Sequence, residues 1–303
     1  ASEALEKERA AEAEAAAADD EVSTQSMALD FTDLMAQKLG DYFEGSRQWA
    51  LDAFVAWLVA DDGSFVFWLK GGAGTGKTAW SAKLVDVHRE AIAAVHFCRH
   101  SDAQTSDPRR MLRSIAAQLR GSVAGFEPGT CDKEGLEEMF EALIAAPLRT
   151  ADAPPDGKRR VILIDALDEC EAEGKNALLD LVATRFGGGA LPPWLRLVVT
   201  SRPEGDIVDK LKAFDPLEME CDKNEGDARL YLRHLLAPKV AAADLDAAVS
   251  LLLRKSEALF LYLDFVRQRL AMVRADAPAT LEDLDAFPAG LDGLYARDFA
   301  RVF

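Results

Sequence analysis

The chain is poor in cysteine, in basic charge and in long apolar runs. Its four cysteines form no CxxC pair, which argues against both a zinc site and the disulfide framework of a small secreted protein. Lys and Arg total 35 against 52 for Asp and Glu, a net charge of -17. A surface of this charge repels nucleic-acid backbones and anionic membranes, so we expect no nucleic-acid or membrane partner. The cysteines are Cys98, Cys131, Cys170 and Cys221.

No apolar run reaches the ~18 to 20 residues that a membrane span needs. The N-terminus is acidic and rich in Ala, whereas a signal peptide is basic and then apolar. We therefore expect a soluble protein of a reducing, cytoplasmic compartment. Because the chain starts at Ala1 and stops at Phe303 inside an apolar helical pattern, we expect it to be a piece of a longer protein.

Short continuous apolar runs along the chain are typical of strands buried on both faces. Segments with helical periodicity lie between them, such as Leu136, Met139, Phe140, Leu143 and Ile144. Strands that alternate with helices predict an α/β fold with a parallel sheet covered on both faces. The predicted strands are Phe65–Leu69, Ile92–Cys98, Val161–Asp165, Leu195–Thr200 and Leu217–Cys221.

The pattern divides the chain into three parts. Residues 1–40 form an N-terminal arm or linker, since 1–22 are mostly Ala, Glu and Lys and offer almost no apolar face. Residues 41–222 form the α/β domain. After Cys221 the strands stop, and apolar residues at helical spacing predict a small helical subdomain at 223–303.

A glycine-rich segment follows the first predicted strand. Gly71-Gly72-Ala73-Gly74-Thr75-Gly76-Lys77-Thr78 fits GxxxxGK[ST] and runs into a good helix at 79–85. Glycines let the backbone wrap an anion with its N–H groups pointing inward, and the helix presents the positive end of its dipole. Lys77 supplies a mobile charge for β and γ phosphates, and the Thr78 hydroxyl suits Mg²⁺. Strand, loop and helix in this order predict a nucleoside triphosphate site.

A second chemical signal ends the strand Val161–Asp165. Carboxyl ends of parallel strands line the crevice where α/β sheets bind ligands, so we expect Asp165 to hold hydrated Mg²⁺. Asp168 and Glu169 follow, and either is a candidate to polarise a water for attack on the γ-phosphate. The alternative is that both acids merely satisfy a helix dipole.

The strand Leu195–Thr200 leads into Ser201-Arg202-Pro203. An arginine at a strand tip beside a phosphate crevice is suited to contact the γ-phosphate and to report its presence. A loop arginine in solvent is the alternative. We discount His96 with His100 as a metal pair, because His96 lies in an apolar strand.

Together, GGAGTGKT, VILIDALDE and LVVTSRPE resemble the NACHT branch of the STAND signalling NTPases, with closest likeness to fungal and nephrocystin-like P-loop domains. The segment Phe43–Trp49 is similar to the one that precedes the nucleotide site in that family. The helix around Gln118 and the stretches 259–266 and 288–295 are similar to its second helix and its helical subdomain. The resemblance covers about 41–303.

The resemblance implies a three-layer P-loop NTPase fold in which the Arg202 strand lies between the P-loop strand and the Asp165 strand. It also implies a switch that holds ADP, exchanges it for ATP, self-associates and recruits partners through sensor and effector domains that this sequence does not contain. Under it, Lys77 and Thr78 bind phosphate and Mg²⁺, Asp165 serves the metal, Asp168 and Glu169 support hydrolysis, and Arg202 senses the γ-phosphate. The choice of ATP over GTP rests on this resemblance alone.

Other functions stay open at this stage. A P-loop kinase would need to exclude water, whereas Asp168 and Glu169 look placed to activate it. A module that holds nucleotide without turnover is a further alternative. An AAA+ motor is disfavoured because we identify no arginine finger or threading loop in the sequence.

Overall fold

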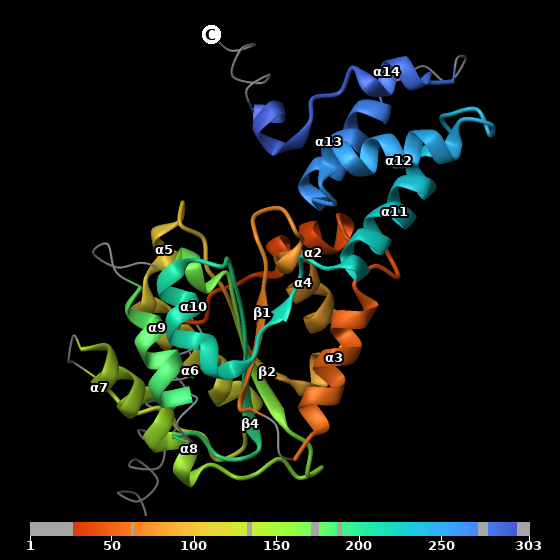
Figure 1. Cartoon of the computed structure of the whole chain (residues 1–303). Coiled ribbons are helices and arrows are strands. Elements are labelled where there is room, and N and C mark those ends of the chain that lie inside the picture. The colour runs from red at the N-terminus through yellow and green to blue at the C-terminus, as the bar shows by residue number, and fades with distance from the viewer. Residues whose placement is uncertain are drawn as a thin grey trace, which may run out of the picture. The chain divides into compact units, whose positions relative to one another are not determined.

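A computed structural model describes residues 27–61, 64–131, 135–170, 176–186, 190–271 and 278–295. The predicted helical arm at 1–22 lies outside these residues. The chain divides into two compact units, of which the first comprises Ala1–Asp33, Ser64–Val66 and His88–Val199. The second comprises Leu34–Gly63, Phe67–Val87 and Thr200–Phe303. Each is described by itself (Figure 1).

Five strands form one sheet in the order β2-β3-β4-β1-β5, and the pairs β2·β3, β3·β4 and β1·β5 are parallel. The α/β class is therefore confirmed, as is the insertion of β4 between β3 and β1. Prediction and structure differ at β5, which has only two residues because the chain enters helix α11 directly after Cys221. The strands are β1 (Val66–Lys70), β2 (Ile92–Phe97), β3 (Arg160–Asp165), β4 (Leu195–Ser201) and β5 (Leu217–Glu218).

In the first unit, helix α6 (Pro108–Ser122) covers β2. It begins where the sequence predicts, because the Asp107 side chain accepts the N–H of Arg109 and Pro108 occupies the first turn. Its Gln118 side chain both donates to Val95 O and accepts from Val95 N–H, each at 2.9 Å. Gln118 thus satisfies backbone groups of the strand at the end of the sheet, which would otherwise stay open.

The other helical segments of this unit are short. The predicted helix around Met139 forms, but with a π-helical stretch in its middle. The elements are η1 (Arg89–Ala91), α5 (Ala103–Ser106), α7 (Leu136–Phe140), η2 (Glu141–Ala145), α8 (Ala146–Thr150), η3 (Leu167–Glu169), α9 (Ala177–Leu181) and η4 (Val182–Phe186).

In the second unit, aromatic rings pack α3 (Gln48–Val59) and α4 (Lys77–Val87) onto β1. The ring of Phe67 on β1 stacks on Trp80 of α4 with centroids 5.9 Å apart, and it meets Phe54 of α3 edge-on at 6.1 Å. These large buried rings fix α4, and with it the loop that precedes α4. This unit also holds α2 (Thr32–Gly40), which begins at the end of the first unit, α10 (Gly205–Leu211) and η5 (Lys212–Phe214).

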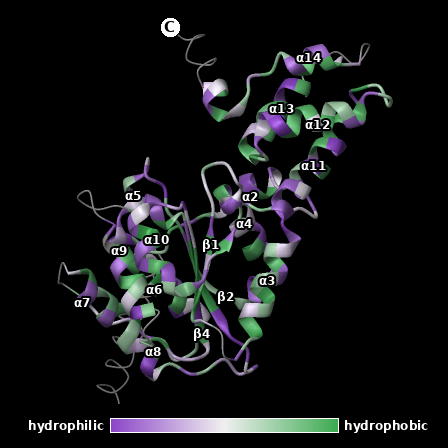
Figure 2. Ribbon diagram, in the orientation of Figure 1, coloured by the Kyte–Doolittle hydropathy of each residue, from purple (hydrophilic) through white to green (hydrophobic). Residues whose placement is uncertain are grey.

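Four further helices of the second unit surround an apolar core of their own, and they carry both green and purple residues, whereas the central strands are largely green (Figure 2). They are α11 (Asp222–Leu236), α12 (Leu245–Ser256), α13 (Phe260–Ala271) and α14 (Leu281–Asp285). The domain boundary at residue 222 stays a prediction. Within the described residues, no helix combines the length and the apolar character required for a membrane span.

Candidate phosphate-binding site

The loop between β1 and α4 has the shape of an anion cradle. Gly74 and Gly76 adopt φ values of 77° and 95°, a region that a side chain disfavours and glycine enters freely. The Lys77 ammonium group points back over the loop, where it donates to Gly71 O at 2.5 Å and to Gly72 O at 2.9 Å. Helix α4 starts at Lys77, so the positive end of its dipole and its first-turn N–H groups face the rim of the loop.

The structure brings the predicted loop residues 71–78 together in one continuous turn. Thr75 is buried and its hydroxyl donates to Gly72 O at 3.0 Å, which ties the loop to itself. Thr78, in the first turn of α4, is half-buried. Its hydroxyl is a hard oxygen ligand of the kind that Mg²⁺ takes beside phosphates. These residues therefore fit a magnesium-bound nucleotide.

Two neighbouring segments of the same unit hold the start of the cradle. The N–H of Gly71 donates to Ser201 O at 3.1 Å, and the N–H of Gly72 donates to Glu220 Oε1 at 2.7 Å. Arg202 follows Ser201 directly and is exposed. The strand end that carries Arg202 thus lies beside the first glycine of the cradle.

The predicted acidic residues lie in the first unit. Asp165 is the last residue of β3 and is buried, and its backbone oxygen accepts from Cys98 N–H at 3.0 Å. Asp168 and Glu169 follow in the short turn η3, not in the long helix that would give them a dipole to satisfy. Glu169 instead accepts a hydrogen bond from the His100 N–H at 3.1 Å.

The charges of Asp165 and Asp168 act on the thiol of the neighbouring Cys98. Cys98 is fully buried, and its hydrogen bond with Cys170, its burial and the charges of Asp165 and Asp168 all raise the pKa of its thiol well above the usual range. The two carboxylates thus lie close enough to Cys98 to act on its thiol.

Sequence reasoning missed Arg47, which lies against the cradle. A methyl group placed on Gly76 would come within 2.7 Å of Cζ of Arg47, so the guanidinium covers that glycine. The other face of the guanidinium lies over the Phe260 ring of α13, with Cζ 3.7 Å from the ring centroid. Its positive φ of 57° and its contacts with Gly76 and Phe260 are properties of the folded chain that the sequence alone does not show.

The environment of Arg47 is unusual for a cation. The residue is 1% exposed, and burial lowers the pKa of its guanidinium to about 10, so it stays charged at neutral pH. Among the described residues, its Nε has no hydrogen-bond partner. The nearby carboxylate of Asp227 accepts the backbone N–H of Arg47 at 2.7 Å and the indole N–H of Trp49 at 3.1 Å.

The helix α13 also touches the cradle through its backbone. The N–H of Leu261 donates to Gly74 O at 3.2 Å. A methyl group on Gly74 would lie 3.0 Å from Cβ of Leu261 and 3.5 Å from Cδ1 of Leu291. The glycines at 74 and 76 therefore serve two purposes, the left-handed turn and the close approach of the helical segment and of Arg47.

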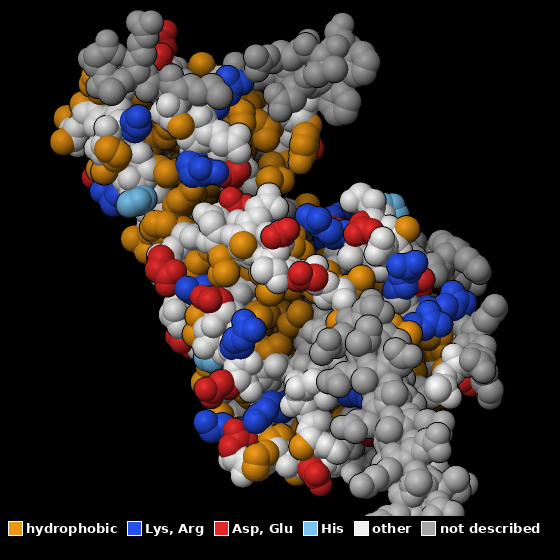
Figure 3. Space-filling view, turned by 180° about the vertical axis from the view of Figure 1, so that it is seen from behind, with side chains coloured by type: hydrophobic (Ala, Val, Ile, Leu, Met, Phe, Trp, Pro, Cys, Tyr) orange, Lys and Arg blue, Asp and Glu red, His pale blue; other side chains and the backbone are white. Residues whose placement is uncertain are grey.

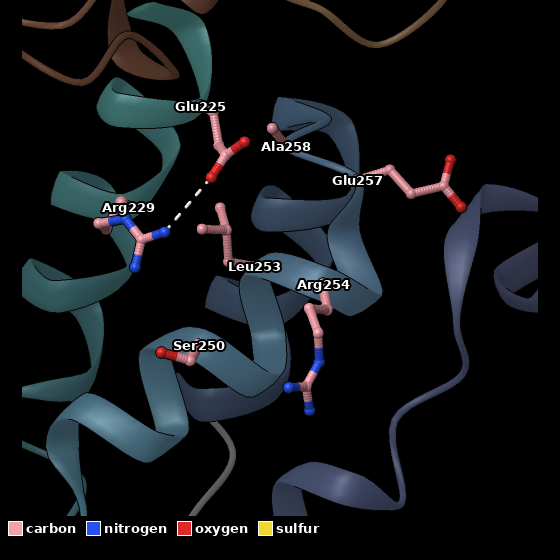
Figure 4. Close-up of a pocket in the computed structure, with 7 residues that line it drawn as sticks. All are labelled: Glu225, Arg229, Ser250, Leu253, Arg254, Glu257 and Ala258. Carbon is pink, nitrogen blue, oxygen red and sulfur yellow. Dashed lines mark hydrogen bonds and ion pairs between the residues drawn. The ribbon is translucent and has the colours of Figure 1, made fainter. Parts of the chain in front are cut away.

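Two cavities are lined by described residues, and residues 71–78 line neither of them. One of about 400 Å³ opens between α11 and α12, where Glu225 and Arg229 form an ion pair, and Ser250, Leu253, Arg254, Glu257 and Ala258 complete its wall (Figure 4). Another, of about 220 Å³, lies against α6 in the first unit.

The described residues contain no group of three or more His, Cys, Asp or Glu side chains able to hold a metal ion. On the face in Figure 3, acidic, basic and apolar side chains are interspersed.

Comparison with known proteins gives this site a family. The profile of the family described as "Nephrocystin 3, N-terminal" matches residues 45–202, just over half of the chain, a span that includes the cradle, Asp165 and Arg202. Vegetative incompatibility protein HET-E-1 of Podospora anserina is 27% identical over 287 residues. That alignment covers 87% of this chain and 21% of HET-E-1, so the chain spans about a fifth of this relative.

Solved structures are similar in fold. The Walker-type ATPase PABY2304 of Pyrococcus abyssi superposes with a TM-score of 0.50 at 13% identity, over 85% of this chain and 75% of that one. Domain III of the replication initiation protein DnaA from Thermotoga maritima gives a TM-score of 0.42 at 12% identity, over 81% of this chain and 92% of that one, too weak to carry an argument. With the sheet order and the family match, the fold is that of a P-loop NTPase. The chain belongs to the nephrocystin 3 N-terminal family and is a NACHT-type NTPase domain.

Proposed function

We propose that this nucleotide-binding module takes ATP and ADP with Mg²⁺ and hydrolyses ATP slowly, as a signalling switch within a longer STAND-type protein. The observation that carries the proposal is Lys77, whose ammonium group is held over the cradle by Gly71 O and Gly72 O at 2.5 and 2.9 Å. In that place its charge lies beside the loop at which β and γ phosphates would bind.

The remaining roles follow from the family and the chemistry of the side chains. Thr78 and Asp165 would share the magnesium ion, Asp168 or Glu169 would orient the attacking water, and Arg202 would contact the γ-phosphate. Self-association and partner domains belong to the same proposal, as does a cytoplasmic location. Magnesium would neutralise charge on the phosphates. The residues of this chain would hold the nucleotide and the metal ion and would orient the attacking water.

Binding of labelled ADP, measured with and without Mg²⁺, tests the proposal. We expect Lys77→Ala to weaken binding at least about 100-fold, since it removes a charge-assisted contact worth about 3 kcal/mol. Asp165→Asn should leave metal-free binding intact and abolish the gain from Mg²⁺. Lys83→Ala is the matched control, because Lys83 lies on the same helix and pairs with Glu44 at 3.1 Å. Equal affinity in all four proteins would overturn the proposal.

One contact favours a second candidate, a module that binds nucleotide without turnover. The Glu169 carboxylate already accepts the His100 N–H at 3.1 Å, which is a structural use of the group proposed as a base. Phosphate release by the wild-type chain decides between the two. Tight ADP binding with no phosphate release above that of Lys77→Ala would favour the second candidate.

A further inference from the structure

Arg47 is a buried cation, and the nearby Asp227 carboxylate bonds to its backbone N–H rather than to its guanidinium. In the described part of the chain its guanidinium forms no ion pair, its Nε has no hydrogen-bond partner, and Nη1 donates a long hydrogen bond of 3.3 Å to Ser46 Oγ. A charge removed from water is costly unless hydrogen bonds and an opposite charge compensate it. The Phe260 ring, 3.7 Å from Cζ, offsets part of that cost but accepts no hydrogen bond in the plane of the guanidinium.

The position of this cation is specific. The guanidinium lies directly against Gly76, the residue that precedes Lys77 in the cradle. Its surroundings include the Phe260 ring and, 5.5 Å from Cζ, the Tyr42 ring, and the charge of Asp227 also acts on it. The backbone is fixed as well, because Arg47 sits at a φ of 57° with its N–H held by Asp227. A long, flexible side chain is thus held at one place beside the cradle.

We infer that Arg47 is a second phosphate-binding cation of this site, which donates N–H groups of its guanidinium to the phosphate chain of the bound nucleotide from the side of Gly76. This inference rests on the proposed function and adds a residue to it. The guanidinium is a planar fork that matches two phosphate oxygens at once, whereas Lys77 acts as a point charge.

The surroundings of Arg47 give binding a consequence beyond affinity. Phe260 begins α13, and Asp227 lies on α11. When an anion draws the guanidinium toward the cradle, the ring of Phe260 loses or changes its contact with the cation. Arg47 therefore joins the phosphates to the helices that follow β5, within one compact unit.

The experiment compares wild type with Arg47→Met and Arg47→Lys, using inorganic pyrophosphate, ADP and GDP as ligands. Arg47→Met should weaken all three by about the same factor, roughly tenfold, because a phosphate contact is shared by all three. Arg47→Lys should lie between, since it keeps the charge and loses the fork. Arg229→Met serves as the control, because Arg229 is exposed and pairs with Glu225 at 3.3 Å.

Thermal unfolding without ligand separates this role from a structural one. A residue kept for stability lowers the melting temperature when it is removed. A buried cation that forms no ion pair does not, so Arg47→Met should melt within about 2 °C of wild type or above it.

Three results would overturn the inference: a clear fall in the melting temperature of the ligand-free variant, pyrophosphate affinity equal to wild type, or a loss confined to one nucleobase. If wild type and Lys77→Ala bind all three ligands equally weakly, the proposed function fails and this inference fails with it. If they differ while Arg47→Met matches wild type, only the inference fails.

Discussion

The phosphate cradle and the acidic end of β3 are built in opposite ways. The cradle is shaped in part by its own residues, since Lys77 and Thr75 both bond to carbonyls of their own loop. Ser201, Glu220 and Leu261 of the same unit add bonds from outside the loop. The acidic end is held by another strand, since Asp165 O and the Glu169 carboxylate accept N–H groups of Cys98 and His100, which follow β2. The shape of the cradle therefore depends in part on local bonds, whereas the acidic end depends on the register of β2 against β3.

Glu169→Gln has the largest expected effect, and it tests whether the acidic end takes part in hydrolysis. If Glu169 orients the attacking water, loss of its charge should slow phosphate release about 100-fold. ADP affinity should not change, because the cradle makes none of its described contacts through Glu169. Phosphate release and ADP binding are measured on the same protein, with the exposed Glu90→Gln as control. Unchanged release would show that Glu169 only anchors His100.

Acidification is the next largest effect, and it acts through His96 on β2. Burial lowers the pKa of this imidazole to about 4, and its Nε2 lies 2.8 Å from Thr105 O. The folded pKa is below the ordinary 6.5, so the unfolded chain binds the proton first and stability falls as pH drops from 6.5 toward 4. Between pH 7 and pH 5 we expect a loss of about 2 kcal/mol in the free energy of unfolding.

Urea unfolding at the two pH values measures that loss. His96→Gln keeps a donor for Thr105 O and does not titrate, so its stability should change much less over the same range. A pH dependence equal to that of wild type would assign the effect to other groups. If phosphate release is lost at pH 5 before ADP binding is lost, the acidic end of β3 is more sensitive to pH than the cradle is.

The same contrast explains what the sequence could and could not predict. The loop 71–78 was found from eight consecutive residues, because backbone conformation and the following helix are local properties. The strands and their order followed from apolar runs and family likeness. Arg47 was missed because its role depends on Gly76 and Phe260, which are distant in sequence and close in space. Glu220 was missed for the same reason, and β5 was predicted too long because its last apolar residues lead into α11.

Arg202→Ala is expected to have a smaller effect, since Arg202 is exposed and solvent screens its charge. If it contacts the γ-phosphate, the ratio of ATP to ADP affinity should fall about fivefold while ADP affinity stays the same. Competition binding of both nucleotides to one preparation measures the ratio. Arg202→Lys should recover part of it. An equal loss for ATP and ADP would move the contact away from the γ-phosphate.

Glu220 offers the smallest and finest test, because it places a carboxylate on the cradle itself. Glu220→Gln keeps an oxygen for the Gly72 N–H, bonded at 2.7 Å in the wild type, and removes a negative charge near the phosphates. ADP should bind about twofold more tightly. Glu220→Ala removes the acceptor as well, and the freed Gly72 should offset that gain, so its affinity should fall below that of Glu220→Gln. Titration of labelled ADP at low and high salt checks this, since only the charge effect is screened. Identical affinities for both variants would mean that the loop keeps its shape without the bond from Gly72 to Glu220, and that its own bonds are sufficient.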